Sequence, residues 1–196
     1  MCNDSNNELR NERRMFLTVT SCALFAVGGA GWITPYIRSW NPSVRAKAAG
    51  APITIDLASI PEGALLVEEW RGRPIYIVKR TKEMIASTLD LNNELLNPDS
   101  EDDQQPEYAR NNHRSIKPEI LVIEGVCTHL GCTPKFRNKK NTNGFTGFFC
   151  PCHGSKFDFS GRVYKGVPAP TNLKVPPHYF ADANTLVVGI DEERQA

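Results

Sequence analysis

The chain has 196 residues, of which 40% are hydrophobic, so it is long enough for one ordinary hydrophobic core and little more. Lysine and arginine number 23 against 22 aspartate and glutamate, which leaves a net charge of +1. This balance lacks the basic footprint of a nucleic-acid-binding protein, so we expect no nucleic acid among the partners. Of the six cysteines, most fall in two short stretches, which indicates a site rather than a disulfide scaffold.

The first predicted element is a transmembrane helix over residues 15–37. The stretch carries no charged residue, and at 1.5 Å per residue it covers roughly 34 Å, enough to cross the hydrocarbon core of a bilayer. Trp32 and Tyr36 lie near its end, where interfacial aromatic side chains are common. The alternative is a buried helix of a soluble core, but the length of the apolar run argues against it.

The orientation of this helix is predicted from the residues around its start. Basic residues flank the helix on both sides, so their number does not decide the orientation. The sequence ERRMFLT, residues 12–18, resembles the twin-arginine signal, which exports proteins that have already folded. We therefore expect residues 1–14 in the cytoplasm, an uncleaved single-pass anchor in a bacterial inner membrane, and the rest of the chain on the periplasmic side.

The residues after the anchor are predicted to form a tether and a head domain. Residues 38–52 are polar and small without apolar periodicity, which predicts a flexible tether. Residues 53–196 carry repeated strand patterns, which predict a mainly β, antiparallel head. The predicted strands are Ile53–Leu57, Pro74–Lys79 and Ile120–Val126, followed by a hairpin over His178–Ile190 around residues 182–184.

A small helical insertion is expected between these strands. Its helix is predicted at Lys82–Leu96, with Thr81 as the N-cap. The apolar stripe of this helix would consist of Met84, Ile85, Leu89, Leu95 and Leu96. The acidic stretch Asp99–Glu107 follows, and it is predicted to be a solvated loop.

Two short stretches, CTHLGC at residues 127–132 and CPCHGS at residues 150–155, contain candidate metal ligands. The ligands follow the pattern C-x-H-x20-C-x-x-H and are Cys127, His129, Cys150 and His153. A zinc ion would accept two thiolates and two imidazoles in a tetrahedral site. However, zinc loops more often use wider spacings, and a zinc site has no need for Cys132 or Cys152. The alternative is a 2Fe–2S cluster, with the cysteines on one iron atom and the histidines on the other.

These two stretches resemble the paired motifs of Rieske proteins nearly residue for residue. The sequence GVPAP at residues 166–170 is similar to the proline-rich loop that shields the cluster in that family. Residues 72–81, 108–119 and 169–177 are similar to the iron–sulfur subunits of bacterial ubiquinol–cytochrome c reductases, the cytochrome bc complexes. The resemblance implies one 2Fe–2S cluster in a Rieske-type β head with a helical insertion and one N-terminal transmembrane helix.

The resemblance also implies a role for each residue of the two loops. Cys127 and Cys150 would hold one iron atom, and His129 and His153 the other. A disulfide between Cys132 and Cys152 would tie the two loops together.

Two further positions bear on the redox potential of the cluster. Ser155 matches the serine whose hydroxyl hydrogen-bonds a bridging sulfide in the family. Phe157 stands where the family often has a tyrosine that donates to a cysteine sulfur, so one donor is lost. We therefore expect a modestly lower redox potential than in relatives that carry the tyrosine.

The implied function is that of a catalytic electron-transfer subunit in a quinol–cytochrome c oxidoreductase, a translocase. His129 and His153 are the expected catalytic residues, because an exposed imidazole could accept the hydrogen bond of ubiquinol and then its proton. Leu130 would contribute to the apolar surface that docks at the quinol site, with packing in the core as its alternative role.

The implied partners are cytochrome b, a membrane-anchored c-type cytochrome and ubiquinol, in a dimeric complex. The alternative function is that of a Rieske small subunit in another periplasmic oxidase, such as arsenite oxidase. The loop at residues 136–143 carries Arg137, Lys139 and Lys140, which predicts either a solvated turn or a contact with an acidic partner.

Overall fold

The computed structural model describes residues 4–139 and 144–191, and the chain divides into two compact units, Met1–Lys47 and Ala48–Ala196. The helices are α1 Asp4–Ser39, α2 Val44–Ala49 and α3 Lys82–Leu89, with 3-10 turns at Leu57–Ser59 and Glu107–Ala109. The strands are β1 Ile53–Asp56, β2 Leu65–Trp70, β3 Arg73–Lys79, β4 Ile120–Glu124, β5 Lys135–Arg137, β6 Gly147–Phe149, β7 Lys156–Phe157, β8 His178–Phe180 and β9 Thr185–Val188.

Helix α1 contains the predicted span at residues 15–37 and extends beyond it at both ends. Residues 4–14, predicted as a segment separate from the anchor, are therefore helical as well. A window of 18 residues within residues 10–48 reaches a mean hydropathy of 1.6, and none of that window is buried. By length and composition, this is a helix able to cross a membrane.

The segment at residues 38–52 differs from the predicted flexible tether. Helix α1 continues to Ser39, and helix α2 occupies residues 44–49. The Ser43 hydroxyl accepts a hydrogen bond from the Ala46 N–H at 3.1 Å, at the start of α2. Alanine, arginine and lysine favour helix strongly. A search for apolar periodicity missed this helix because the side chains of residues 44–48 are exposed.

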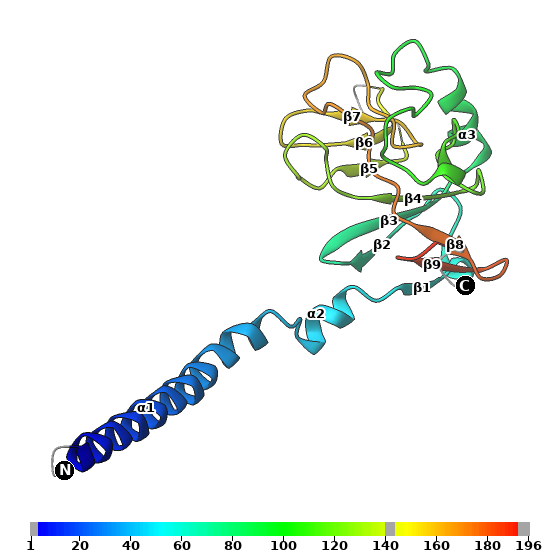
Figure 1. The fold of residues 1–196 in the computed structure, drawn as a ribbon. Helices are drawn as coiled ribbons and strands as arrows, with labels where there is room; N and C mark the ends of the chain where they lie inside the picture. The colour runs from blue at the N-terminus through cyan, green and yellow to red at the C-terminus, as the bar shows by residue number, and fades with distance from the viewer. Residues whose placement is uncertain (1–3, 140–143, 192–196) are drawn as a thin grey trace. The chain divides into compact units, whose positions relative to one another are not determined.

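The described residues of the head domain form three antiparallel sheets, each of three strands (Figure 1). Their orders are β1–β9–β8, β2–β3–β4 and β5–β6–β7. The first and last strands of the head, β1 and β9, pair with each other, with Ile55 opposite Leu186. The hairpin expected over residues 178–190 is confirmed as β8 and β9.

The sheet β2–β3–β4 lies between the other two sheets (Figure 1), and its strands β3 and β4 are buried on both faces. Successive side chains of a strand point to opposite faces, so alternate residues enter different cores. Residues that pack with β1 and β9 include Ile75, Ile77, Ile120 and Val122. Residues that pack toward the cysteine-rich loops include Tyr76, Val78, Leu121 and Ile123. This two-sided burial explains why the β4 sequence is almost continuously apolar.

The predicted strands at residues 74–79 and 120–126 are confirmed as β3 and β4, but several strands were not predicted. Strand β2 escaped prediction because Glu68 and Glu69 interrupt its apolar pattern. Strands β5, β6 and β7 have at most three residues each, too few for a periodic signal.

The helix predicted over residues 82–96 is wrong in its second half, because α3 ends at Leu89. Its start is as predicted, since the Thr81 hydroxyl accepts a hydrogen bond from the Met84 N–H at 3.3 Å. Leu95 is fully buried, but it forms an isolated bridge with Tyr164 rather than a helical stripe. Leu89 and Leu96 are about half exposed, at 51% and 52%.

A buried polar network joins the insertion to the chain that follows β7. Asp158 and Arg162 are fully buried and form an ion pair, with 2.8 Å between Asp158 Oδ2 and Arg162 Nε. Asp158 Oδ1 also accepts hydrogen bonds from the backbone N–H groups of Ser160 and Arg162, at 2.9 and 2.7 Å. The Arg162 guanidinium donates to the carbonyl oxygens of Pro98, at 3.1 Å, and Thr88.

Two more buried arginines complete this network. Arg80 donates to the Ser115 hydroxyl at 2.7 Å and to the His113 carbonyl at 2.9 Å. Arg114 donates to the Gln105 side chain at 2.9 Å and to the Gly161 carbonyl at 3.2 Å. Burial lowers the pKa of Arg80 to about 10 and that of Arg114 to about 9. Both side chains stay protonated at neutral pH. The network therefore contains three buried cations, Arg80, Arg114 and Arg162, and one buried carboxylate, Asp158.

Candidate metal centre

The two cysteine-rich loops, residues 127–132 and 150–155, have the same backbone hydrogen-bond pattern. In the first loop the Cys127 N–H donates to the Cys132 carbonyl at 2.8 Å. In the second loop the Cys150 N–H donates to the Ser155 carbonyl, also at 2.8 Å. Each loop is thus closed between its first and last residues, which fixes the first cysteine at the base of the loop.

A glycine allows each loop to turn tightly. The Gly131 N–H donates to the Cys127 carbonyl at 2.9 Å, and the Gly154 N–H donates to the Cys150 carbonyl at 3.0 Å. Both glycines have φ near +80°, a backbone conformation that residues with a Cβ atom rarely adopt. The first loop directly follows β4 and the second connects β6 to β7, so rigid strands hold both.

The four predicted ligands come from these two loops, and the structure places them in two pairs, one of cysteines and one of histidines. Cys127 and Cys150 are buried, and the two thiols interact closely enough for Cys150 to influence the pKa of Cys127. The His129 and His153 rings lie edge to face, with 4.7 Å between their centroids. Among the described residues, the Nδ1 atom of His129 is one of the buried polar atoms without a hydrogen-bond partner. A buried nitrogen without a partner, two residues along the same loop from a buried thiol, suits a metal cluster with mixed sulfur and nitrogen ligands.

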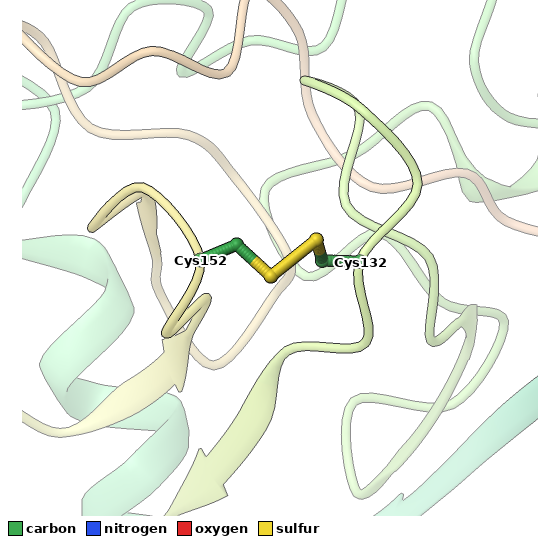
Figure 2. Close-up of a disulfide and its surroundings, with 2 residues drawn as sticks. All are labelled: Cys132 and Cys152. Carbon is green, nitrogen blue, oxygen red and sulfur yellow. A yellow bond between two sulfur atoms is a disulfide. The ribbon is translucent and has the colours of Figure 1, made fainter.

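The two remaining cysteines of the loops form a disulfide, as the resemblance implied. Figure 2 shows Cys132 of the first loop bonded to Cys152 of the second loop, across a Cα–Cα distance of 6.7 Å. The Cys150 sulfur lies within 4.8 Å of both disulfide sulfurs. These three sulfurs are no metal site, because two of them are already bonded to each other.

Burial also affects the protonation of the site. It raises the pKa of the Cys127 thiol, and the neighbouring Cys150 raises it further. Hydrogen bonds from the backbone at His129 and from the Ser155 hydroxyl oppose this effect. A raised pKa favours the neutral thiol, so metal binding at Cys127 must displace a proton.

The proline-rich segment at residues 166–170 is linked to the second loop through Ser155. The Ser155 side chain is fully buried, and its hydroxyl oxygen accepts a hydrogen bond from the Ala169 N–H at 3.0 Å. The first loop contacts the residue that follows this segment: the Thr128 hydroxyl donates a hydrogen bond to the Thr171 carbonyl at 2.7 Å. These two contacts were not predicted, since each joins positions far apart in the sequence.

The structure also locates the exposed side chains around the loops. Leu130 is 71% exposed, which excludes the alternative that it packs in the core of the head. The Arg137 guanidinium lies over the Phe149 ring, 4.3 Å from its centroid. Lys139 is exposed, whereas Lys140 and the end of its predicted loop lie outside the described residues.

Comparison with known proteins identifies the family of this chain. The ubiquinol–cytochrome c reductase iron–sulfur subunit of Allochromatium vinosum is 45% identical over 184 residues, which cover 91% of this chain and 89% of the relative. The chain belongs to this family of Rieske iron–sulfur subunits. The corresponding subunit of Bradyrhizobium diazoefficiens is 44% identical, over 90% of this chain and 94% of its own length.

Two further comparisons agree with this assignment. The Rieske [2Fe-2S] domain family matches residues 102–177, which include both cysteine-rich loops. A chain of a hyperthermophilic respiratory Complex III is 27% identical with a TM-score of 0.50, over 86% of this chain and 98% of its own. The cofactor of this iron–sulfur subunit is therefore a Rieske 2Fe–2S cluster, and zinc is not its metal.

Substitution of Ser155 by alanine is expected to lower both the stability of the fold and the redox potential of the iron–sulfur subunit. It leaves the Ala169 N–H without its partner, which should lower the free energy of unfolding by about 1–3 kcal/mol. It also removes a hydroxyl that favours the thiolate of Cys127, so the redox potential should fall. Denaturant unfolding and redox titration measure the two effects.

Ser59→Ala is the matched control, because the Ser59 hydroxyl is exposed and donates only to the Asp56 carbonyl, at 2.8 Å. It should change neither quantity appreciably. A Ser155→Ala protein with unchanged stability and potential would contradict the role assigned to this hydroxyl.

Proposed function

We propose that this iron–sulfur subunit accepts an electron and a proton from ubiquinol and passes the electron to a c-type cytochrome. Its family relatives are subunits of ubiquinol–cytochrome c reductase, and the matched solved chain belongs to a Complex III. The observation that carries the proposal is that two matching loops supply a pair of buried thiols and a pair of imidazoles in edge-to-face contact. When bound, the cluster supplies a one-electron acceptor of high potential.

The proposed ligands are Cys127 and Cys150 for one iron atom and His129 and His153 for the other. The buried Nδ1 atom of His129 lacks a hydrogen-bond partner among residues 4–139 and 144–191, which supports its assignment to iron. Two neutral imidazoles in place of two thiolates remove negative charge from the site. A less negative site is easier to reduce, which suits the oxidation of a quinol.

The same histidines are proposed to handle the proton. With one ring nitrogen bound to iron, the other nitrogen of His129 or His153 remains available to the quinol hydroxyl. That nitrogen would accept the hydrogen bond of the quinol hydroxyl and then its proton. The edge-to-face arrangement of the two rings supports a shared role at one surface of the head.

Leu130 is proposed to dock the head at the quinol site. A large apolar side chain that is 71% exposed leaves water when it meets an apolar partner surface. It directly follows His129 in the sequence, so its docking would bring the imidazole to the quinol. The partners proposed are cytochrome b and a membrane-anchored c-type cytochrome in a dimeric complex.

The proposed location is a bacterial inner membrane, with α1 as a single-pass anchor and the head on the periplasmic side. The Cys132–Cys152 disulfide supports this side, because disulfides persist in an oxidising compartment. The twin-arginine pattern at residues 12–18 supports the export of a head that folds around its cofactor in the cytoplasm. Translocase activity is proposed for the complex as a whole.

Purification of the complex from detergent-solubilised membranes tests the proposed function. We expect b-type and c-type haems to co-purify with this subunit, and low-temperature EPR of the reduced sample to give a rhombic signal that shifts with quinone-site inhibitors. Co-purification with molybdopterin and a signal insensitive to those inhibitors would instead identify an arsenite-oxidase type of complex. The relatives named above do not favour that alternative.

Phe157→Tyr is expected to raise the redox potential of the cluster. Phe157 is fully buried in the same core as Cys127 and Cys150, so a phenol hydroxyl at this position enters the environment of the ligand sulfurs. One additional hydrogen bond of about 1 kcal/mol corresponds to a rise of roughly 40 mV for a one-electron couple. Redox titration followed by EPR measures the change. A potential that is unchanged or lower would show that the hydroxyl reaches no sulfur.

A further inference from the structure

The cysteine-rich loops place three sulfur atoms close together, although only two of them are bonded to each other. The Cys150 sulfur lies within 4.8 Å of the sulfurs of Cys132 and Cys152. Cys150 itself is in no disulfide. A free cysteine beside a disulfide can, as its thiolate, attack one of the disulfide sulfurs and release the other.

The two disulfide sulfurs are not equivalent targets for this attack. Attack at Cys132 would form a Cys132–Cys150 bond and release Cys152, whose side chain is exposed and can be solvated as the leaving thiolate. Attack at Cys152 would instead close a ring through Pro151 alone and would cut the covalent link between the two loops. A disulfide needs its two Cβ atoms in a narrow range of geometries, which such a short ring restricts. The geometry therefore favours Cys132 as the target.

We propose that, in the iron-free protein, Cys150 exchanges with the Cys132–Cys152 disulfide to give a Cys132–Cys150 disulfide and a free Cys152. One sulfur–sulfur bond breaks and one forms, so there is no net oxidation and no external oxidant is needed. The proton of the Cys150 thiol passes to solvent, and the released Cys152 thiolate takes one up. The loops remain tied together, so the exchange leaves the head folded.

This exchange would make loss of the cluster irreversible until the new disulfide is reduced. A Cys150 sulfur that is held by iron is no longer a free nucleophile, so the bound cluster keeps the native disulfide in place. Once the iron has gone, the exchange consumes Cys150 and prevents a new cluster from binding. Only this protective effect rests on the proposed ligand set, because the exchange itself requires no more than the three neighbouring sulfurs.

Disulfide mapping of the full-length protein in detergent tests the proposal, in a background with Cys2 and Cys22 replaced by serine. The cluster is removed anaerobically with a chelator, and samples taken over time are alkylated, digested and analysed by mass spectrometry. We expect a gain of the Cys132–Cys150 peptide, a matching loss of the Cys132–Cys152 peptide, and alkylation at Cys152. The fraction of protein that can rebind a cluster should fall in parallel and recover after reduction with dithiothreitol.

Two variants distinguish the attacking thiol. Cys127→Ala should still undergo the exchange, whereas Cys150→Ala should retain the Cys132–Cys152 disulfide throughout. The rate in the parent protein should not depend on protein concentration, because the reaction is intramolecular. The proposal is overturned if Cys132–Cys152 remains the sole disulfide after iron removal, or if Cys150→Ala still releases Cys152.

The cluster-loaded protein provides a separate test of the ligand assignment. It should show only the Cys132–Cys152 disulfide over the same period. If the loaded protein exchanged as fast as the iron-free one, Cys150 would not be an iron ligand, and the proposed ligand set would fail while the exchange itself stood.

Discussion

His129→Gln is expected to yield a subunit without its 2Fe–2S cluster and a complex without quinol–cytochrome c reductase activity. Glutamine has a similar length, but its amide is a far poorer iron ligand than imidazole. The buried Nδ1 atom of His129, which has no hydrogen-bond partner within the part of the chain that the structure describes, is the atom that iron would bind. Because the cluster needs all four ligands, the rhombic EPR signal and the iron content should both be lost rather than reduced.

The chain offers a matched control among its four histidines. His113 contributes mainly its backbone, since its carbonyl accepts a hydrogen bond from Arg80 at 2.9 Å and its N–H donates to Asn111 at 3.0 Å. His113→Gln should therefore keep the EPR signal and the activity. If His129→Gln retained a normal rhombic signal, His129 would not be a ligand, and the proposed site would have to be abandoned.

Asp158→Ala is expected to lower the free energy of unfolding by about 3–5 kcal/mol, because it leaves the Arg162 guanidinium buried without a counter-charge. Both side chains of this pair are at most 1% exposed. Asp158 also stabilises the charges of Arg80 and Arg114, which are buried in the same network. Removal of Asp158 therefore lowers the free energy of unfolding further. Two backbone N–H groups would lose their acceptor as well. Denaturant unfolding followed by circular dichroism measures the change.

The exposed ion pair between Glu107 and Arg110 provides the comparison, with 3.5 Å between Arg110 Nε and Glu107 Oε2. Glu107→Ala should lower the free energy of unfolding by less than about 1 kcal/mol, since solvent screens this pair. The double variant Asp158→Ala, Arg162→Met should be less destabilised than the sum of its single variants, because no unpaired charge remains buried. Equal losses of unfolding free energy in Asp158→Ala and Glu107→Ala would show that the buried pair contributes no more stability than the exposed pair.

Residues close together in the sequence were predicted well. The anchor at residues 15–37 depends only on a continuous apolar run, and Thr81 caps α3 through a hydrogen bond to a residue three positions away. The two loops are local features as well, because each is closed by its own backbone hydrogen bonds, while their ligand set stays a prediction. The error in α3 arose where tertiary packing overrode propensity, since Leu95 pairs with Tyr164 from a distant segment.

The β character of the head, the two cysteine-rich loops and the chemistry of their donors follow from the amino-acid sequence, because those features depend on residue type and short spacings. The surroundings of the loops follow only from the three-dimensional fold. The contact of Ser155 with Ala169 and the burial of three arginines around Asp158 join segments that no local pattern connects. The proximity of Cys150 to the disulfide likewise depends on how β4 and β6 set the two loops side by side. Such contacts arise from the packing of distant strands against one another, which short-range sequence patterns do not encode.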